Sequence, residues 1–308
     1  MKIAVTGAAG LVGQNLIPRL KACGHCSIVA IDKHERNAAI LRQLHPDIEV
    51  LLYDLATDNG WQMSIAGADV VIIAHAQIGG LDRNSFVANN ITATERLLGA
   101  IGQRKPFVIH ISSSVVNSAA EDWYTVTKER QEKLVRKSGL PAVVLRPTLM
   151  FGWFDRKHLG WLARFMSRHF LFPVPGQGRY LRQPLYAGDF CDIVVSCVEN
   201  RPIGKDYNIS GLEQIDYIDL MRAVREACGA TARIVRIPYR LFWLLLYVYA
   251  LFDRNPPFTT QQLEALVTPD IFDVIDWPKI FGVRPTPLME ALSDTFHHPP
   301  YSNIALEF

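Results

Sequence analysis

The chain has 308 residues, of which 49% are hydrophobic and 20% are charged, so it can form a packed core and is not intrinsically disordered. At this length we expect one large or two modest domains. The formal net charge of +2 gives no broad basic surface, which argues against a nucleic-acid partner. Five cysteines are sparse and odd in number, which argues against a disulfide framework, so we expect a cytoplasmic protein.

Short β-rich runs alternate with helical patterns through the first half of the chain. The strands are continuously apolar, which is typical of a parallel sheet buried on both faces. We therefore predict an α/β fold with a Rossmann-type doubly wound parallel sheet covered by helices on both sides. The predicted strands are 2–6, 27–32, 49–53, 69–74, 107–112 and 142–146, and the predicted helices are 11–22, 90–102 and 123–138.

A glycine-rich turn joins the first predicted strand to the first predicted helix. Its sequence, TGAAGLVG at 6–13, has glycines at positions i, i+3 and i+6. Such a turn lets the backbone approach a pyrophosphate, and the helix N-terminus adds N–H groups and the positive end of its dipole. The turn therefore predicts a dinucleotide site, with contacts from Gly7, Ala9, Gly10, Leu11, Val12 and Gly13.

Two acidic residues follow neighbouring strands and are candidates for the adenosine half of the dinucleotide. Asp32 ends the second predicted strand, where a carboxylate accepts hydrogen bonds from the ribose hydroxyls and repels a 2′-phosphate. This favours NAD over NADP, although Lys33, His34 and Arg36 follow closely and leave NADP as an alternative. Asp54 ends the third strand and is placed to touch the adenine ring.

A tyrosine, a lysine and a run of serines form the candidate catalytic group. Tyr124 and Lys128 are four residues apart in a helical pattern, which puts both on one face of the helix. A phenol with a pKa near 10 is a poor acid–base group at neutral pH, and a nearby ammonium together with the nicotinamide's positive charge favours the phenolate. Ser112, Ser113 and Ser114 end an apolar strand, and we expect one of their hydroxyls beside Tyr124.

These motifs together resemble the extended short-chain dehydrogenase/reductase family, which contains NAD-dependent nucleotide-sugar epimerases, dehydratases and ketoreductases. The resemblance covers essentially the whole chain. Its motifs are TGAAGLVG at 6–13, NITAT at 90–94, SSS at 112–114, YTVTK at 124–128, LRPTLMFG at 145–152, GQG at 176–178 with Arg182 beyond it, GD at 188–189 and YNISG at 207–211.

The resemblance implies individual roles. Ser113 aligns with the catalytic Ser/Thr and orients the reacting oxygen, with Ser114 as the alternative catalytic serine and as a substrate contact. Tyr124 moves the hydroxyl proton, Lys128 holds the ribose, and Arg182 meets the diphosphate of the substrate. A homodimer is the family-level expectation. The other cofactor contacts on this basis are Leu55, Ala74, His75, Ala76, Asn90 and Pro147, with His75 alternatively a hydrogen-bonded histidine at a strand end.

The chain also departs from the family pattern. Family dehydratases carry an Asp–Glu pair after the catalytic Ser/Thr, but Ser114 and Val115 stand here, which disfavours dehydration. Only ten residues separate Ser113 from Tyr124, fewer than in many nucleotide-sugar enzymes, so the sugar pocket loses part of its wall.

The apolar run 241–252 is too short to span a bilayer and is either a buried, pocket-capping helix or a surface that touches a membrane or lipid tail.

These observations predict two domains and an enzymatic function. The NAD-binding Rossmann domain comprises residues 1–148 and about 185–210, and a smaller irregular α+β substrate-binding domain comprises about 149–184 and 211–308. We find no metal site and no thiol-exchange motif, because Cys23 closes a helix and the histidines near the C-terminus lack ligand partners at suitable spacing.

The predicted reaction is NAD-dependent 4-epimerisation of a diphosphate-linked sugar through a transient 4-keto intermediate. One alternative is an NAD(P)H-dependent 4-keto-sugar reductase, and another is either reaction on a polyprenyl-diphosphate-linked sugar. A steroid- or terpenoid-type dehydrogenase and a non-catalytic dinucleotide-binding scaffold are the remaining alternatives. The predicted partner is therefore a nucleotide-sugar or lipid-diphosphate-sugar substrate, with peripheral membrane contact through 241–252.

Overall fold

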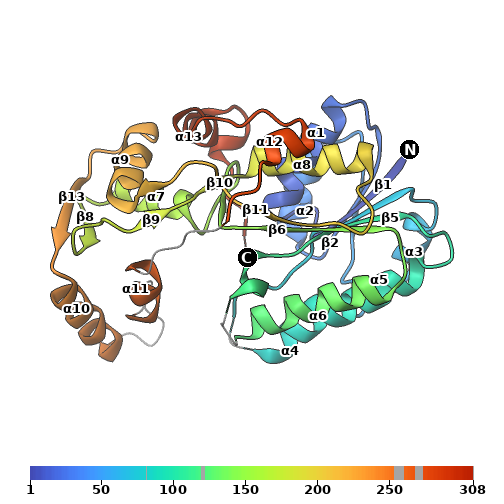
Figure 1. Cartoon of the computed structure of the whole chain (residues 1–308), viewed down its shortest axis with the longest axis horizontal. Helices are drawn as coiled ribbons and strands as arrows, with labels where there is room; N and C mark the ends of the chain where they lie inside the picture. Colours follow the sequence, from blue (N-terminus) through green and yellow to red (C-terminus); the bar gives the residue numbers. More distant parts are fainter. Residues whose placement is uncertain (81, 119–121, 253–259, 268–272, 308) are drawn as a thin grey trace.

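The computed structural model describes residues 1–80, 82–118, 122–252, 260–267 and 273–307. A seven-stranded sheet in the order β11-β6-β5-β4-β1-β2-β3 forms its larger part, and every neighbouring pair in it is parallel (Figure 1). The chain turns back at the boundary between β1 and β4, which is where such sheets bind ligands beyond the carboxyl ends of their strands. The strands are β1 (Lys2–Thr6), β2 (Ser27–Asp32), β3 (Glu49–Leu52), β4 (Val70–Ile73), β5 (Phe107–Ile111), β6 (Ala142–Pro147) and β11 (Asp206–Ile209).

Helices cover both faces of the sheet because successive side chains of each strand point to opposite sides. In β1, Ile3 and Val5 pack with α1 (Leu11–Ala22), α2 (Glu35–Leu44) and α8 (Ala187–Asn200), whereas Ala4 packs with the helices on the opposite face. Figure 1 shows α1 and α8 above the sheet and α5 and α6 below it. The helices of the second face are α3 (Trp61–Ile65), α5 (Ala93–Ile101) and α6 (Trp123–Lys137).

The predicted fold class is confirmed, and every strand predicted from the sequence is present to within about two residues. The predicted helix 90–102 is more complex than its periodicity indicates. It begins as α4 (Arg83–Phe86), passes through a π-helical segment (Val87–Thr92) and continues as α5. Such π-helical turns are frequent at functional sites, and this one lies beside α6. Helices α2 and α3 were not predicted, since they are short and α3 has only five residues.

A second hydrophobic core lies outside the sheet and is formed by residues between 151 and 292, including Phe151, Val174, Met221 and Leu292. Helices α7 (Leu159–Arg168), α9 (Tyr217–Ala227) and α13 (Leu288–His297) surround it. Three small two-stranded sheets join these helices: β7 (Met150–Phe151) with β10 (Leu185–Tyr186), β8 (Leu171–Pro175) with β13 (Arg233–Ile237), and β9 (Leu181–Arg182) with β12 (Ile215–Asp216).

The last part of the chain does not follow the predicted division into domains. Trp277 of α12 (Trp277–Phe281) is buried in the core beneath α8, and its Nε1 donates to the Ser210 carbonyl at 3.0 Å. Near the C-terminus, the backbone N–H of Glu307 donates to Asn37 of α2 at 2.8 Å. Both segments fall in the range predicted as substrate-binding, yet they pack on the Rossmann part.

Two further helices, α10 (Tyr239–Phe252) and α11 (Thr260–Val267), follow β13. Figure 1 shows α10 at the end of the molecule, away from the seven-stranded sheet. Among the helices that the structure describes, none combines the length and the apolarity needed to cross a membrane.

Candidate active site

The turn between β1 and α1 accepts only glycine at two of its positions. Gly7 has a φ of +66°, and a Cβ there would lie 2.6 Å from the backbone of His75, at the end of β4. A Cβ on Gly13 would lie 2.3 Å from the Ala8 carbonyl oxygen. Real Cβ atoms essentially never come this close to backbone atoms. Glycine at position 7 therefore lets the turn pack against the end of β4, and glycine at position 13 lets the first turn of α1 pack against Ala8.

The N-terminus of α1 offers backbone donors at this turn. Gly10 is the N-cap and has no side chain to satisfy them, and the first intrahelical bond runs from Gln14 N–H to the Gly10 carbonyl at 3.0 Å. The N–H groups of Leu11, Val12 and Gly13 therefore have no acceptor within the helix. Unpaired donors at the positive end of a helix dipole fit the pyrophosphate of a dinucleotide.

Asp32 fixes the geometry of this turn from the end of β2. Its Oδ2 accepts from Ala9 N–H at 2.9 Å and its Oδ1 from His34 N–H at 2.9 Å. Burial raises the pKa of the carboxyl group, and these backbone N–H groups oppose the shift. Asp32 is thus beside the glycine turn, as predicted, and its contact with the ribose stays a prediction.

Lys33 and Arg36, two of the three basic residues that leave NADP open as an alternative, are engaged by other side chains, whereas His34 Nδ1 is buried without a hydrogen-bond partner. Lys33 Nζ lies 3.0 Å from Asp54 Oδ2 and 2.6 Å from Asn89 Oδ1. Arg36 forms an ion pair with Glu307. A 2′-phosphate would have to compete with these carboxylates, so the arrangement favours NAD.

His75 is held by two threonines. Its Nδ1 lies 2.7 Å from Thr6 Oγ1, and its Nε2 lies 3.0 Å from Thr94 Oγ1. Burial, reinforced by the charge of Lys128, lowers the pKa of the imidazole to about 3, so the ring is neutral at physiological pH. The two hydrogen bonds of its side chain agree with the alternative interpretation of His75 as a hydrogen-bonded histidine at a strand end. Its backbone packs directly against Gly7.

Asn90 joins the segment after β4 to α6. Its Oδ1 accepts from Gln77 N–H at 2.6 Å, and its Nδ2 donates to the Gln77 carbonyl at 3.2 Å and to Thr127 Oγ1 at 2.9 Å. These bonds make Asn90 a support of the cofactor side of the site, while direct contact with the cofactor stays a prediction. Four other residues were expected to contact the cofactor. Ala74 donates its N–H to the Thr6 carbonyl, and Ala76 lies in the loop after β4. Leu55 is buried in the sheet core, and Pro147 is the last residue of β6.

The three consecutive serines have different surroundings. Ser112 Oγ donates to Glu132 Oε1 at 2.6 Å, inside an ion-pair group that includes Arg146. Ser113 Oγ accepts from Val115 N–H at 3.4 Å, and its interaction with the Tyr124 hydroxyl acts to lower the pKa of the tyrosine. Ser114 is buried at the start of a short 3₁₀ helix. Ser113 is thus the serine that influences Tyr124, and its catalytic role stays a prediction.

Tyr124 and Lys128 share α6. Burial raises the pKa of Tyr124, Ser113 opposes that shift, and Asp122 reinforces it. Lys128 Nζ donates to the Ile111 carbonyl at 2.9 Å and to Gln131 Oε1 at 2.6 Å, and its effect on Tyr124 stays a prediction. Without a bound cofactor, Tyr124 is therefore the protonated phenol at neutral pH.

Lys128 has an unusually low basicity. Burial lowers the pKa of its ammonium to about 7, and the charge of Glu132 opposes that shift. Gln131 links this lysine to the His75 group, since its Nε2 donates to Thr94 Oγ1 at 2.8 Å. The sequence analysis did not identify Gln131 or Thr94. Gln131 follows Lys128 by three residues on one helix face, and that spacing was the available signal.

Arg182 lies in β9, among protein groups. Its guanidinium donates to the carbonyls of Leu181, at 3.0 Å, and Leu266, and it lies 5.5 Å from the Tyr180 ring centroid. Its contact with a substrate diphosphate stays a prediction. For that contact, the guanidinium would have to give up a hydrogen bond to one of these carbonyls and donate to phosphate oxygens instead.

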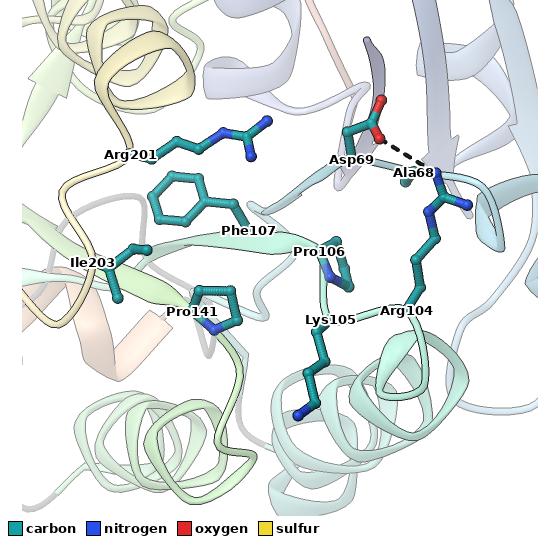
Figure 2. Close-up of a pocket in the computed structure, with 9 residues that line it drawn as sticks. All are labelled: Ala68, Asp69, Arg104, Lys105, Pro106, Phe107, Pro141, Arg201 and Ile203. Atoms are coloured by element: carbon teal, nitrogen blue, oxygen red, sulfur yellow. Dashed lines mark hydrogen bonds and ion pairs between the residues drawn. The ribbon is translucent and has the colours of Figure 1, made fainter.

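A pocket of about 320 Å³ lies elsewhere on the molecule. Asp69, Arg104 and Arg201 help to line it, and Phe107, the first residue of β5, forms its wall (Figure 2). It is therefore at the amino ends of the strands, on the opposite edge of the sheet from the glycine turn. The described residues in and around the pocket include none of the predicted catalytic group.

A doubly wound sheet with a glycine turn at its reversal point and polar side chains beyond its carboxyl ends defines a class of dinucleotide-dependent enzymes. The profile of the NAD dependent epimerase/dehydratase family matches residues 3–210, and the chain belongs to this family. It is accordingly an NAD-dependent enzyme of the extended short-chain dehydrogenase/reductase type, as the motifs indicated.

Individual relatives are distant. The crystal structure of UDP-glucuronic acid 4-epimerase from Bacillus cereus in complex with NAD superimposes with a TM-score of 0.75 at 23% identity, covering 96% of this chain and 97% of that chain. An uncharacterized UDP-glucose epimerase of Bacillus subtilis is 27% identical over 272 residues, 75% of this chain and 84% of the relative. A 4-hydroxy-2-methyl-3-oxo-4-farnesyl-3,4-dihydroquinoline-1-oxide ketoreductase of Stigmatella aurantiaca is 25% identical over 261 residues, 78% of this chain and 77% of the relative.

Proposed function

We propose that the chain is a 4-epimerase of a sugar carried on a nucleoside diphosphate and that it works through a transient 4-keto sugar. The observation that carries this proposal is the placement of Ser113, just after β5, beside Tyr124, at the start of α6, on the same sheet edge as the glycine turn. Oxidation and re-reduction at one carbon need a group that exchanges a proton with a single oxygen, and this pair supplies it.

Each residue of the pair has a separate task. Tyr124 Oη accepts the proton of the sugar hydroxyl as the carbon is oxidised and returns it as the ketone is reduced. Ser113 hydrogen-bonds the reacting oxygen and keeps it within reach of Tyr124. NAD, when bound, supplies the hydride acceptor and donor. Because burial favours the neutral phenol, Tyr124 must ionise before it can accept the proton of the sugar hydroxyl, and a positive charge beside it would favour that ionisation.

We further propose that Asp32 sets the preference for NAD. Its carboxylate is fixed by two backbone N–H groups, and Lys33 is paired with Asp54. We expect Asp32→Ser to raise the ratio of kcat/KM with NADP to that with NAD, while Asp47→Ser, an exposed change elsewhere, leaves the ratio unchanged. An unaltered ratio in Asp32→Ser would show that other residues set the cofactor preference.

A reductase acting on a hydrophobic or lipid-linked substrate is the second candidate. The ten residues between Ser113 and Tyr124 leave less wall around a sugar, and the Stigmatella aurantiaca relative is by name a ketoreductase of a farnesyl-bearing compound. The Bacillus cereus and Bacillus subtilis proteins, by name a UDP-glucuronic acid 4-epimerase and a UDP-glucose epimerase, favour the first candidate.

The experiment begins with the purified protein. It is denatured, and the released dinucleotide is identified by absorbance and mass. Fresh protein is then incubated with UDP-glucuronic acid or UDP-glucose without added cofactor, and the C4 epimers are resolved by chromatography. We expect retained NAD and interconversion of one sugar pair. Dependence on added NADH or NADPH, with reduction of a ketone and no epimer formed, would instead establish the reductase.

A tyrosine variant tests the catalytic assignment. We expect Tyr124→Phe to lower kcat by roughly 10²–10⁴-fold, the usual contribution of a positioned acid–base group, without loss of NAD. The matched control is Tyr207→Phe in β11, whose ring packs on Phe281 at a centroid distance of 4.9 Å. Equal turnover in Tyr124→Phe and the wild-type protein would remove Tyr124 from the mechanism.

A further inference from the structure

Helix α10 exposes its apolar residues instead of burying them. Leu241, Leu244, Leu245 and Val248 recur at positions i, i+3, i+4 and i+7 and are 48%, 51%, 54% and 42% exposed. We call these four residues the apolar stripe. In a globular protein, a stripe with this spacing normally faces the core. Here it faces outward over two helical turns, so it is continuous and unlike the scattered apolar residues of ordinary surfaces.

Aromatic side chains accompany the apolar stripe. Trp243 and Tyr247 stack with ring centroids 5.3 Å apart and an interplanar angle of 7°, and Tyr247 is 49% exposed. Tryptophan and tyrosine have an apolar body and a polar tip, which suits them to the boundary between acyl chains and water.

The charged residues of α10 and of the segment that precedes it have one sign. Residues 228–252 contain no aspartate or glutamate and three arginines, Arg233, Arg236 and Arg240. All three are exposed. Arg236 and Arg240 immediately precede the apolar stripe, so a cationic segment borders the apolar one. This charge distribution complements the anionic headgroups of a phospholipid leaflet.

The length of α10 decides how it can meet a bilayer. Fourteen residues make a helix about 21 Å long, shorter than the roughly 30 Å hydrocarbon core. It therefore cannot span the bilayer, but it can lie in the interface with one face buried. Its position at the end of the molecule, away from the sheet, leaves it accessible to a flat surface (Figure 1).

We propose that α10 docks on an anionic phospholipid bilayer, with the apolar stripe in the headgroup–acyl boundary and Arg236 and Arg240 at the lipid phosphates. This inference goes beyond the proposed catalytic function and does not rest on it. If the second candidate, a lipid-linked substrate, also holds, docking brings the substrate-binding part of the chain to the surface where such a substrate would be presented.

Vesicle sedimentation of the full chain tests the docking. Wild-type protein is mixed with vesicles of phosphatidylcholine alone or of phosphatidylcholine and phosphatidylglycerol, and the bound fraction is measured. We expect binding to the anionic vesicles that weakens at high salt. The double variant Leu244→Ser and Leu245→Ser should lower the partition coefficient at least tenfold, since two large side chains leave the interface. The matched control is Met63→Ser with Ile203→Ser, two residues that are 83% and 58% exposed elsewhere on the molecule.

The arginines give an independent measurement. We expect Arg236→Gln and Arg240→Gln each to lower binding to anionic vesicles about fivefold and to leave binding to neutral vesicles unchanged. Wild-type protein that stays in the supernatant with both kinds of vesicle overturns the proposal without reliance on any variant. A dimer in sedimentation equilibrium that the leucine double variant dissociates also overturns it, because the apolar stripe would then join two copies of the chain.

Discussion

Lowering the pH from 7 to 5 is expected to destabilise the folded protein through His75. Burial lowers the pKa of this imidazole from 6.5 to about 3. Below pH 6.5 the unfolded chain binds a proton at His75 that the folded chain does not bind until about pH 3. The unfolded state therefore gains stability as the pH falls through this window, and the free energy of unfolding decreases.

The size of the effect follows from the shift. One pKa unit corresponds to about 1.4 kcal/mol, and pH 5 lies about 1.5 units below the unfolded value. His75 alone should then lower the free energy of unfolding by at most about 2 kcal/mol between pH 7 and pH 5. That is a large part of the roughly 5–15 kcal/mol by which domains are stable.

The assay is urea unfolding at pH 7 and pH 5, followed by circular dichroism. His75→Gln can hydrogen-bond a threonine but does not titrate, so the difference between the two pH values should shrink by up to about 2 kcal/mol relative to the wild type. His169→Gln, at an exposed histidine, should leave that difference unchanged. If the wild type and His75→Gln lose the same stability on acidification, the folded protein already takes up the proton and the argument fails.

Two other changes test the site and its support. Gly13→Ala should abolish NAD retention and destabilise the fold by at least about 1–3 kcal/mol, because its Cβ would lie 2.3 Å from a backbone oxygen. The control is Gly99→Ala, where a Cβ meets open space. This change should be neutral or should stabilise the fold by up to about 1 kcal/mol. Glu132→Ala should lower the free energy of unfolding in urea by at most about 3–5 kcal/mol, because the largely buried Arg146 loses its partner at 2.7 Å and keeps only Asp206 at 3.4 Å.

For Gly13→Ala and for Glu132→Ala, one result would contradict the prediction. Equal melting temperatures and equal NAD content for Gly13→Ala and Gly99→Ala would mean that the glycine turn relaxes freely and does not define the cradle. A loss below about 1 kcal/mol for Glu132→Ala would place its ion pairs in the range of solvent-screened surface pairs.

Local patterns were sufficient for the architecture. Six of the seven strands of the sheet are short, mainly apolar runs and were predicted, whereas β11 contains Asp206 and Asn208 and was not. The glycine turn was recognisable because Gly7 combines a φ of +66° with the His75 backbone 2.6 Å from where a Cβ would lie, and glycine meets both demands. Short elements such as α3 left no periodic signal, since five residues complete little more than one helical turn.

The site required contacts between distant parts of the chain. Ser112, Ser113 and Ser114 are indistinguishable by residue type, and only the packing of β5 against α6 assigns Ser112 to Glu132 and Ser113 to Tyr124. The same packing buries Lys128 and directs its ammonium to Ile111 and Gln131, two acceptors that the helical spacing with Tyr124 did not indicate.

The sequence by itself determined the order of the strands and helices, the glycine turn and the residues that can carry chemistry, because these depend on neighbours within a few positions. The tertiary structure decided which serine meets the tyrosine, which charges are buried, and that the apolar stripe of α10 faces outward. Burial and pairing are properties of the packed whole. A run of apolar residues has the same letters whether it lies in a core or on a surface, and only the fold fixes which face is covered.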